Sequence, residues 1–545
     1  MRVLVATVAI LVAAAAPAPA AAAILRGSDG ADRLLGTAGR DAAYGRAGRD
    51  LVDGRRGPDF LHGGDDADLL LGGAGPDRIV AALDGAPDQV RCGPGRDLVA
   101  AELVDAVAPD CELVVRQLSR DTSTDASAQH ETQVEPDSMA AGRTVVVAFQ
   151  SGRHVQGGAA AIGWATSTDA GTTWRAGFLP GLTLFSTPAG TSDVASDPVV
   201  AWDAAHRTWI VVTLGVTQAG TTLMVSRSLD GTRWELPVTA LTAGDEAIDK
   251  QWATCDNGAR SPFRGRCYVA YLDVAAGQIA VIRSTDGGRT WSAPVGSRAG
   301  VGVRGILNGA QPAVLPDGTL VVLFSLFGVF ADAGSDGMLA MRSRDGGASF
   351  EPAAPVAQLL SEEVSGVRAP PFASVEVDAS GRVWTAWQDC RHRPECGANE
   401  LVLASSGDGL TWSAPARVPV GTREGVDAFV PGLAVDPTRA GRRARLAIVY
   451  HTIAQPGDCP PDECRAVDVW LVRSEDGGRT WTPPLRLTPR AIRLPWIAQT
   501  GLGRMLGDYV SASWAGGRAV AVFALADEPA RDRFRQAVFA AAVEG

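Results

Sequence analysis

The sequence predicts an all-β protein in which a short parallel β-roll precedes a β-propeller. Aspartate and glycine recur every nine residues near the N-terminus, and a phrase such as STDGGRTW recurs six times further on, 56 to 69 residues apart. The chain of 545 residues is rich in turn formers, with 63 Gly and 33 Pro between short apolar runs. Repeats of these lengths are typical of solenoids and propellers, and frequent turns are typical of short strands.

The nine-residue period begins at Gly27 and carries two registers at once. Six aspartates keep the period, and each is followed two residues later by an apolar side chain. Each repeat therefore predicts one short strand with one inward-facing side chain. The aspartates are Asp32, Asp41, Asp50, Asp59, Asp68 and Asp77, and the glycines five residues before them are Gly27, Gly36, Gly45, Gly54, Gly63 and Gly72.

This segment resembles the hemolysin-type (RTX) calcium-binding repeat, GGxGxDxUx, most closely in GGAGPDRIV at residues 72–80. The resemblance covers about residues 27–80. It implies a parallel β-roll whose turns bind Ca²⁺ through the six aspartates and backbone carbonyls. Thr37, Arg46 and Arg55 replace the second Gly of the motif, so we expect several turns to bind Ca²⁺ weakly or not at all. The alternative is a Gly- and Asp-rich stalk in which the aspartates only cap turns.

The composition changes along the chain and predicts the domain boundaries. Residues 81–111 keep a weaker form of the repeat, so the β-roll is expected over residues 27–111. Residues 118–133 are polar and poor in apolar side chains, which predicts a linker. The propeller is expected to fill residues 134–545.

The recurring phrase predicts a turn. Its Asp can accept hydrogen bonds from turn amides, its Gly can supply a positive φ, and its aromatic residue can pack under the next strand. The phrases resemble the Asp boxes (BNR repeats), SxDxGxTW, of secreted bacterial sialidase-like β-propeller proteins, in which the boxes lie on the rim, away from the substrate. They begin at Ser167, Ser228, Ser284, Ser343, Ser405 and Ser474.

A second repeat decides the expected number of blades. A strand pair with a central turn, such as QPAVLPDGTLVVLFSL, recurs seven times in residues 134–545. Seven blades are therefore favoured, and six, as in sialidases, remain the alternative. The last pair is followed by one further strand, so residues 111–118 are expected to supply a strand to the closing blade.

The N-terminus, the charge and the cysteines point to export. Residues 1–23 have the layout of a cleaved signal peptide, which predicts a secreted, extracellular protein. A net charge of −11 argues against nucleic-acid partners, and no later segment is apolar enough to insert in a membrane. Disulfides are favoured over a metal site, because no CxxC occurs. The expected pairs are Cys92 with Cys111, Cys255 with Cys267, Cys390 with Cys396, and Cys459 with Cys464.

Polar residues at strand starts and strand ends are expected to converge on one face of the disc. Carboxylates can act as acids or bases, and arginines bind anionic groups bidentately, so this face is the predicted site. The catalytic candidates are Glu135, Asp389, Arg391, Arg504, Asp508 and Tyr509, and the ligand-binding candidates are Arg153, Asp197, Asp249, Lys250 and Trp252.

Three functions remain open at this point. The first is a secreted calcium-binding protein that binds a carbohydrate or extracellular polymer, without catalysis. The second is a glycoside hydrolase of exo-sialidase-like type with Tyr509 as nucleophile; the absence of the family's Arg-Ile-Pro-like motif before the first blade weighs against it. The third is a protein-interaction scaffold.

Overall fold

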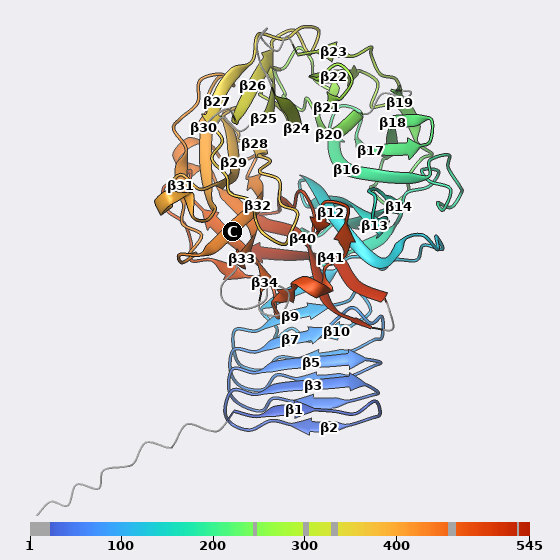
Figure 1. Ribbon diagram of the computed structural model, residues 1–545, viewed down its shortest axis with the longest axis vertical. Helices are drawn as coiled ribbons and strands as arrows, with labels where there is room; N and C mark the ends of the chain where they lie inside the picture. The colour runs from blue at the N-terminus through green and yellow to red at the C-terminus, as the bar shows by residue number, and fades with distance from the viewer. Residues whose placement is uncertain are drawn as a thin grey trace, which may run out of the picture.

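The computed structural model describes residues 22–243, 248–297, 305–328, 336–455, 465–530 and 533–544. It is an all-β structure in which the N-terminal strands stack into a column below a larger set of antiparallel sheets (Figure 1). Most of the predicted signal peptide, and the cysteines Cys459 and Cys464, lie outside the described residues.

The predicted parallel β-roll is confirmed, and it is a two-sided β-solenoid. Two nine-residue repeats form one coil, so Ala43 pairs with Leu61 and Leu61 with Ile79. These side chains, with Leu70 and Val90 from the opposite sheet, fill a buried core. One sheet contains β1 (Ile24–Arg26), β3 (Ala42–Ala47), β5 (Phe60–Asp65), β7 (Arg78–Ala81), β9 (Leu98–Ala101) and β11 (Leu113–Gln117); the other contains β2 (Arg33–Leu35), β4 (Leu51–Asp53), β6 (Leu69–Leu71), β8 (Gln89–Arg91) and β10 (Ala106–Val107).

The rest of the described chain forms antiparallel strands. They are β12 (Gln129–Ala141), β13 (Thr144–Arg153), β14 (Ala159–Ser167), β15 (Arg175–Phe178), β16 (Val194–Asp203), β17 (Thr208–Thr217), β18 (Gly220–Ser228), β19 (Val238–Thr242), β20 (Ile248–Cys255), β21 (Cys267–Asp273), β22 (Gln278–Ser284), β23 (Val295–Gly296), β24 (Ile306–Val314), β25 (Leu320–Phe327), β26 (Gly337–Ser343), β27 (Ala354–Gln358), β28 (Ser374–Val377), β29 (Val383–Asp389), β30 (Glu400–Ser406), β31 (Ala416–Val418), β32 (Val426–Val435), β33 (Leu446–Ala454), β34 (Ala466–Ser474), β35 (Leu485–Arg486), β36 (Ile492–Arg493), β37 (Gln499–Thr500), β38 (Gly503–Arg504), β39 (Ser511–Ala515), β40 (Arg518–Ala530) and β41 (Arg533–Glu544). Short 3₁₀ turns occur at η1 (Pro394–Cys396), η2 (Gly441–Arg443) and η3 (Leu494–Trp496).

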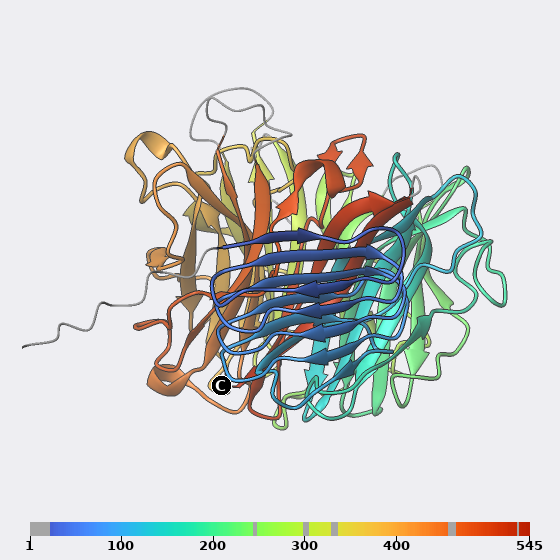
Figure 2. The same ribbon diagram turned by 90° about the horizontal axis from the view of Figure 1, so that it is seen from below.

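The prediction of a closed β-propeller with seven, or six, separate blades is wrong. The topology is that of a β-solenoid in which the sheet that contains β1 continues into the C-terminal strands. The odd-numbered strands β1, β3, β5, β7, β9 and β11 share one 17-stranded sheet with β12–β19 and β39–β41. Separate four- and five-stranded sheets, β20–β23, β24–β27, β28–β31 and β32–β36, follow. Figure 2 shows the solenoid strands lying across the ends of this larger region.

The physical reason is the open edge of the solenoid. The last coil would leave backbone N–H and C=O groups of β11 unpaired, and such an exposed sheet edge readily pairs with another strand. β11 pairs in parallel with β9 and antiparallel with β41, where Val115 lies opposite Ala541 and Gln117 opposite Phe539. Counting strand pairs along the sequence does not reveal a sheet that joins segments more than 400 residues apart. The expected use of residues 111–118 as a partner for the last strands is confirmed.

The four full-length copies of the recurring phrase fold into the same turn. In the third copy the Ser284 hydroxyl donates to Asp286 (2.8 Å), and the backbone N–H of Gly288 donates to the Ser284 oxygen (2.9 Å). The indole N–H of Trp291 donates to the carbonyl of Gly288 (3.2 Å). Although burial opposes the shift, hydrogen bonds from Thr290 and its neighbours lower the pKa of Asp286 to about 2. The phrase is therefore a self-contained turn that holds its own carboxylate ionised.

Two copies lack one residue and are built differently. In the fifth copy, Ser406 and not Ser405 donates to the turn carboxylate, that of Asp408 (3.0 Å), so the sequence register was wrong by one. In both short copies the glycine directly follows the aspartate. The indole nitrogens of Trp234 and Trp412 have no hydrogen-bond partner among the described residues. The shortened turn does not place a glycine carbonyl within reach, as the full-length turn does for Trp291.

Disulfides join Cys92 to Cys111, Cys255 to Cys267 and Cys390 to Cys396. The Cys92–Cys111 bond, with a sequence separation of 19, ties the end of β8 to the residues before β11. We expect Cys92→Ala/Cys111→Ala to destabilise the solenoid by about 3 kcal/mol, because the crosslink restricts the unfolded chain. Thermal unfolding followed by circular dichroism measures the loss. Cys390→Ala/Cys396→Ala, which opens a separation of only 6, is the control with a smaller expected effect; equal effects would contradict the account.

Candidate functional site

The aspartates of the solenoid form two continuous rows. The backbone N–H of Asp41 donates to a carboxylate oxygen of Asp59 (2.7 Å), one coil later, and that of Asp59 donates to Asp77 (2.8 Å). The rows extend beyond the predicted repeats, because the weaker repeats after residue 80 keep the same turn. The further members are Asp88, Asp97, Asp105 and Glu112.

The second carboxylate oxygen of each aspartate separates the turns into two kinds. In the first two turns it is already bonded: Asp32 accepts from the N–H and hydroxyl of Ser28, and Asp41 accepts from those of Thr37. In the next four turns this oxygen is buried and has no partner within the described part of the chain. These four aspartates are Asp50, Asp59, Asp68 and Asp77.

The backbone explains the difference. Arg46 and Arg55 adopt the same left-handed conformation as Gly64 and Gly73, with φ of 84° and 67° against 118° and 100°. Their amides therefore do not bond the aspartate as those of Ser28 and Thr37 do. The two turns that contain Arg46 and Arg55 therefore have the same backbone form as the two following turns, which contain Gly64 and Gly73.

The unpartnered oxygens fit a hard cation. A Cβ atom built on Gly54 would lie 2.6 Å from both an oxygen of Asp59 and the carbonyl of Gly72, so two oxygens converge there. Burial raises the pKa of Asp68 and of Asp77 to about 7, which shows how unfavourable these buried carboxylates are when no cation is present. Ca²⁺ prefers carboxylate and carbonyl oxygens. Asp50, Asp59, Asp68 and Asp77, with backbone carbonyls, would hold it, and its charge would offset that of the buried carboxylates. In the described ranges, no three His, Cys, Asp or Glu side chains are placed to hold a metal ion together, so backbone carbonyls would supply further ligands.

Gly54→Ala tests this geometry. The added methyl group meets the carbonyl of Gly72 and the carboxylate of Asp59, so we expect a loss of about 1–3 kcal/mol in stability and fewer bound Ca²⁺ ions. Isothermal titration with Ca²⁺ measures the stoichiometry. Gly30→Ala is the matched control, since the nearest atom to its Cβ, the Ser28 hydroxyl, is 3.9 Å away. Unchanged Ca²⁺ stoichiometry in Gly54→Ala would contradict the assignment.

A second constellation lies where the first strands of the antiparallel sheets meet. Glu135, Asp197 and Lys250 occupy β-bulges in β12, β16 and β20, at the same level of three neighbouring strands. Each has a positive φ, of 52°, 47° and 47°. A bulge re-aims one side chain, and a positive φ in a non-glycine residue persists only where the surroundings hold it. The strands therefore direct these three side chains toward one point.

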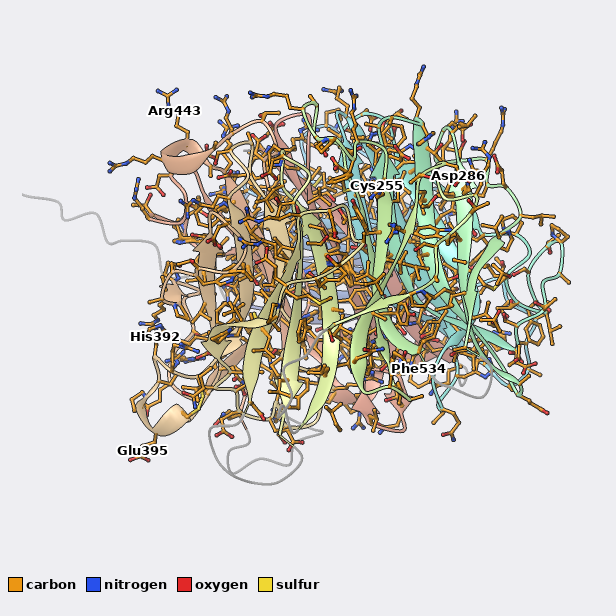
Figure 3. All side chains as sticks on the ribbon, turned by 90° about the horizontal axis from the view of Figure 1, so that it is seen from above. Cys255, Asp286, His392, Glu395, Arg443 and Phe534 are labelled. Carbon is orange, nitrogen blue, oxygen red and sulfur yellow. A yellow bond between two sulfur atoms is a disulfide. The ribbon has the colours of Figure 1, made fainter. Side chains whose placement is uncertain are left out.

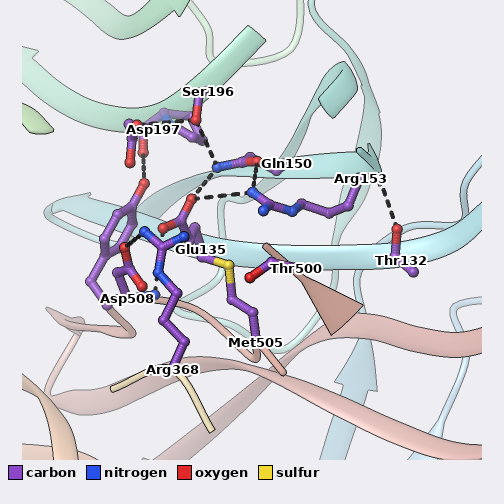
Figure 4. Close-up of polar contacts among 12 residues, drawn as sticks. Thr132, Glu135, Gln150, Arg153, Ser196, Asp197, Arg368, Thr500, Met505 and Asp508 are labelled. Carbon is purple, nitrogen blue, oxygen red and sulfur yellow. Dashed lines mark hydrogen bonds and ion pairs between the residues drawn. The ribbon is translucent and has the colours of Figure 1, made fainter. Parts of the chain in front are cut away.

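We call Glu135, Arg153, Asp197, Lys250, Arg368 and Asp508 the charged cluster (Figure 4). The Lys250 ammonium lies 2.6 Å from Asp197, 2.8 Å from Asp508 and 3.1 Å from Glu135. Arg368 pairs with the same oxygen of Asp508 that Lys250 contacts. Three cations balance three carboxylates in a cluster of which the carboxylates are almost fully buried.

The charged cluster shifts the pKa values of its carboxylates in different directions. Burial raises the pKa of Glu135 to about 7, although Lys250 opposes the shift. Burial also acts on Asp508, but Lys250 and Arg368 together hold its pKa below the usual value. The two carboxylates share one ammonium, but their pKa values shift in opposite directions. Arg368 contacts Asp508 directly, whereas Arg153, the second cation beside Glu135, lies 4.0 Å from its carboxylate. Against burial, the three carboxylates raise the pKa of Lys250 well above its ordinary value.

A cavity of about 480 Å³ begins at Lys250 and Asp508. Trp252 and Tyr509 line it, with their rings edge to face and 5.0 Å apart. Two further carboxylates, Asp137 and Glu376, also line it, and burial raises their pKa values to about 7 and about 8. Aromatic rings beside a few carboxyl groups in a cavity of this size form a surface typical of sugar binding.

The other predicted site residues are placed differently. The phenol of Tyr509 donates to the carbonyl of Pro198 (3.2 Å), and burial raises its pKa well above its ordinary value. Asp389 and Arg391 form a pair with each other (2.7 Å) at the end of β29, beside the Cys390–Cys396 disulfide. Arg504 approaches the charged cluster through its carbonyl, which accepts from the N–H of Arg368 (2.7 Å).

Asp249 lies next to Lys250, and its carboxylate accepts from the Lys250 N–H (2.9 Å). Burial and the neighbouring Asp197 raise the pKa of Asp249.

Sequence reasoning missed several of the residues that complete this site. Arg368 lies in the irregular segment before β28, where no pattern announces it. Glu376 lies between two valines of β28, which is a usable signal, whereas Asp137 lies in the largely polar β12 and gives no such signal. The strongest unused signal is Lys250, the only lysine among 50 basic side chains. A compact ammonium fits between three carboxylates, whereas a planar guanidinium does not.

Comparison with known proteins supports the reading of the solenoid. Residues 26–61 and 44–79 match the RTX calcium-binding nonapeptide repeat. No curated protein matches the chain. In the described residues, no helix has the length and apolar character required to cross a membrane.

Among solved structures, a Hadza microbial sialidase aligns at 16% identity over 73% of this chain and 76% of its own, with a TM-score of 0.41. A PL25 ulvan lyase aligns at 12% identity over 77% and 96%, with a TM-score of 0.41. The GH93 α-L-arabinofuranosidase of Fusarium graminearum aligns at 12% identity over 62% and 89%, with a TM-score of 0.37. These neighbours act on carbohydrates. What the comparisons establish for this chain is that its N-terminal region carries RTX calcium-binding repeats, with Ca²⁺ as their cofactor.

Proposed function

We propose that this chain is a secreted calcium-binding protein whose residues 134–545 bind a carbohydrate or another extracellular polymer without cleaving it. Residues 27–111 form the calcium-binding part, and residues 118–133 join the two. Glu135, Arg153, Asp197, Asp249, Lys250, Trp252 and Asp508 form or flank the binding site. The observation that carries the proposal is the cavity beside the charged cluster, with Trp252 and Tyr509 on its wall.

The position of Lys250 favours binding over hydrolysis. A glycosidase needs room between its two carboxyl groups for a glycosidic oxygen or a water. Between Glu135 and Asp508 that room is taken by the ammonium, which lies 3.1 Å and 2.8 Å from them. The opposite pKa shifts of Glu135 and Asp508 are the one feature that favours an acid–base pair.

The sialidase-like mechanism has less support. Tyr509 contacts a backbone carbonyl instead of a glutamate, and its raised pKa makes it a poor nucleophile. Arg391 is paired with Asp389, away from Arg153 in the charged cluster. Three arginines facing one pocket are therefore not assembled from Arg153, Arg391 and Arg504.

The recurring turns are proposed to be Asp boxes with a structural role. Their support is the repeated Ser–Asp–Gly hydrogen-bond pattern, together with a cavity lining that includes no residue of these six turns. Asp286, in one of these turns, lies at the opposite edge of the molecule from the loop that carries His392 and Glu395 (Figure 3).

Trp252→Ala tests the proposed site. We expect at least about tenfold weaker binding of the glycan that binds best in a panel of neutral and anionic oligosaccharides, because a ring that packs on a sugar contributes 1.4 kcal/mol or more. Trp291→Ala, which removes a partly buried tryptophan in a distant turn, is the control. Equal affinities in the two variants would place the binding site elsewhere.

Turnover assays with fluorogenic glycosides, sialosides included, separate the two functions. We expect none from the purified mature protein. If the protein hydrolyses a glycoside and Asp508→Asn or Tyr509→Phe abolishes that activity, the binding proposal is wrong and the protein is a glycoside hydrolase.

A further inference from the structure

A cleft of about 990 Å³ separates the turn edge of the solenoid from the ends of β34, β35, β40 and β41. It is distinct from the cavity at Trp252. We call it the junction cleft. Four carboxylates line it, and six arginines outnumber them: Arg78, Arg96, Arg116, Arg473, Arg486 and Arg518.

Half of these arginines are already engaged within the protein. Arg486 binds Asp468 (2.6 Å), and Arg518 binds Glu544 (2.6 Å). Arg116 donates to the carbonyl of Glu102 (2.9 Å). These contacts hold the three side chains in place. The other three arginines of the cleft have no comparable contact.

Arg78, Arg96 and Arg473 make no side-chain hydrogen bond or ion pair with any described residue. Each of the four carboxylates in the cleft already has a bonded oxygen. Asp77, Asp97 and Glu112 accept backbone N–H groups of the aspartate rows, and Glu544 binds Arg518. Arg78 and Arg473 are also half-buried, so water does not fully replace the missing partners.

The unmatched arginines carry an electrostatic cost. Burial, together with the nearby Arg486 and Arg40, lowers the pKa of Arg78. Burial likewise lowers the pKa of Arg473. Arg78 lies over the ring of Phe60, 6.0 Å from its centroid, but this contact leaves its N–H donors unused. A half-buried guanidinium without a hydrogen-bonded or ionic partner can bind an anion, since its planar donors bind carboxylate or sulfate bidentately.

We propose that the junction cleft binds an anionic glycan chain, with Arg78, Arg96 and Arg473 contacting its carboxylate or sulfate groups. The shape and lining favour this ligand over others. No Phe, Tyr or Trp is among the cleft-lining residues, whereas single-stranded nucleic acids need aromatic rings on which bases stack. The half-buried arginines lie within a cleft, where a flat membrane surface does not reach them.

The test is isothermal titration of the calcium-loaded mature protein with heparin and hyaluronan oligosaccharides and with a neutral dextran oligosaccharide of similar length. We expect saturable binding of at least one anionic glycan, weakened by added salt, and no binding of dextran. Arg78→Gln/Arg96→Gln/Arg473→Gln is expected to bind at least about tenfold more weakly. The control Arg175→Gln/Arg233→Gln/Arg260→Gln removes the same charge from exposed positions and is expected to stay within about twofold of the unaltered protein.

Three results would overturn the proposal: no binding of either anionic glycan, equal losses in the two triple variants, or equally tight binding of oligothymidylate. If the first triple variant unfolds, Arg96→Gln alone, at an exposed position, is expected to weaken binding about threefold, and an unchanged affinity would overturn the proposal. Trp252→Ala is expected to leave this binding intact, so failure here is distinguishable from failure of the proposed function.

Discussion

Replacing Lys250 with methionine is expected to lower the free energy of unfolding by about 3–5 kcal/mol, because the change leaves three buried carboxylates without their common cation. Methionine has nearly the length of lysine, so lost packing contributes little. Denaturant unfolding of the full chain, compared with the unaltered protein, measures the effect.

The pH dependence of this effect distinguishes charge from packing. The raised pKa of Lys250 means that its contribution is fully present at neutral and acidic pH and is lost only as pH rises through that raised value. In the variant, the buried carboxylates bind protons more tightly in the folded protein than in the unfolded chain, so the folded state loses stability as pH rises. We therefore expect a larger destabilisation at pH 8 than at pH 5, and a pH-independent loss would contradict the electrostatic account.

Removing Ca²⁺ is expected to lower the unfolding temperature of the solenoid in the full chain. A ligand present at one hundred times its Kd stabilises the folded state by about 2.7 kcal/mol. In the solenoid, four buried aspartate oxygens without a hydrogen-bond partner are available to bind Ca²⁺. Differential scanning calorimetry with Ca²⁺, with chelator and with Mg²⁺ in place of Ca²⁺ measures the effect. Mg²⁺ is expected to rescue poorly, because it demands a stricter octahedral geometry.

The solenoid is also expected to influence its neighbour, because β11 pairs with β41. Melting of the coils then exposes an edge of β41. Identical transitions in Ca²⁺ and in chelator would contradict a calcium-stabilised solenoid.

The solenoid could be predicted because its information is local. Each turn repeats within nine residues. The spacing of the aspartates from Asp41 to Asp77 predicts coils, and these coils bury Ala43, Leu61 and Ile79. The kind of turn was less visible: Arg46 and Arg55 look like departures from the motif, yet their backbones match those of glycine. Only the three-dimensional turn shows which carboxylate oxygens are left without partners.

The sheet topology could not be predicted because it depends on distant pairing. Antiparallel strand pairs were visible in the sequence, but the joining of β11 to β41 depends on how the solenoid meets the C-terminal strands. The expectation that polar residues at strand starts converge identified Glu135, Asp197, Lys250 and Asp508. Bulges place the first three at one level, and Asp508 lies just before β39. Arg368 lies in an irregular segment, so neither alternation nor a motif indicated it.

The most direct test of the central claim uses the single lysine of the chain. Protein grown with ¹⁵N-lysine gives one Lys250 backbone signal and one ammonium signal, at the wall of the proposed binding cavity. We predict that the ammonium signal is protected from exchange at neutral pH and that both signals shift when the best-binding neutral glycan is added. A bound glycan that leaves both signals unchanged would contradict binding beside the charged cluster.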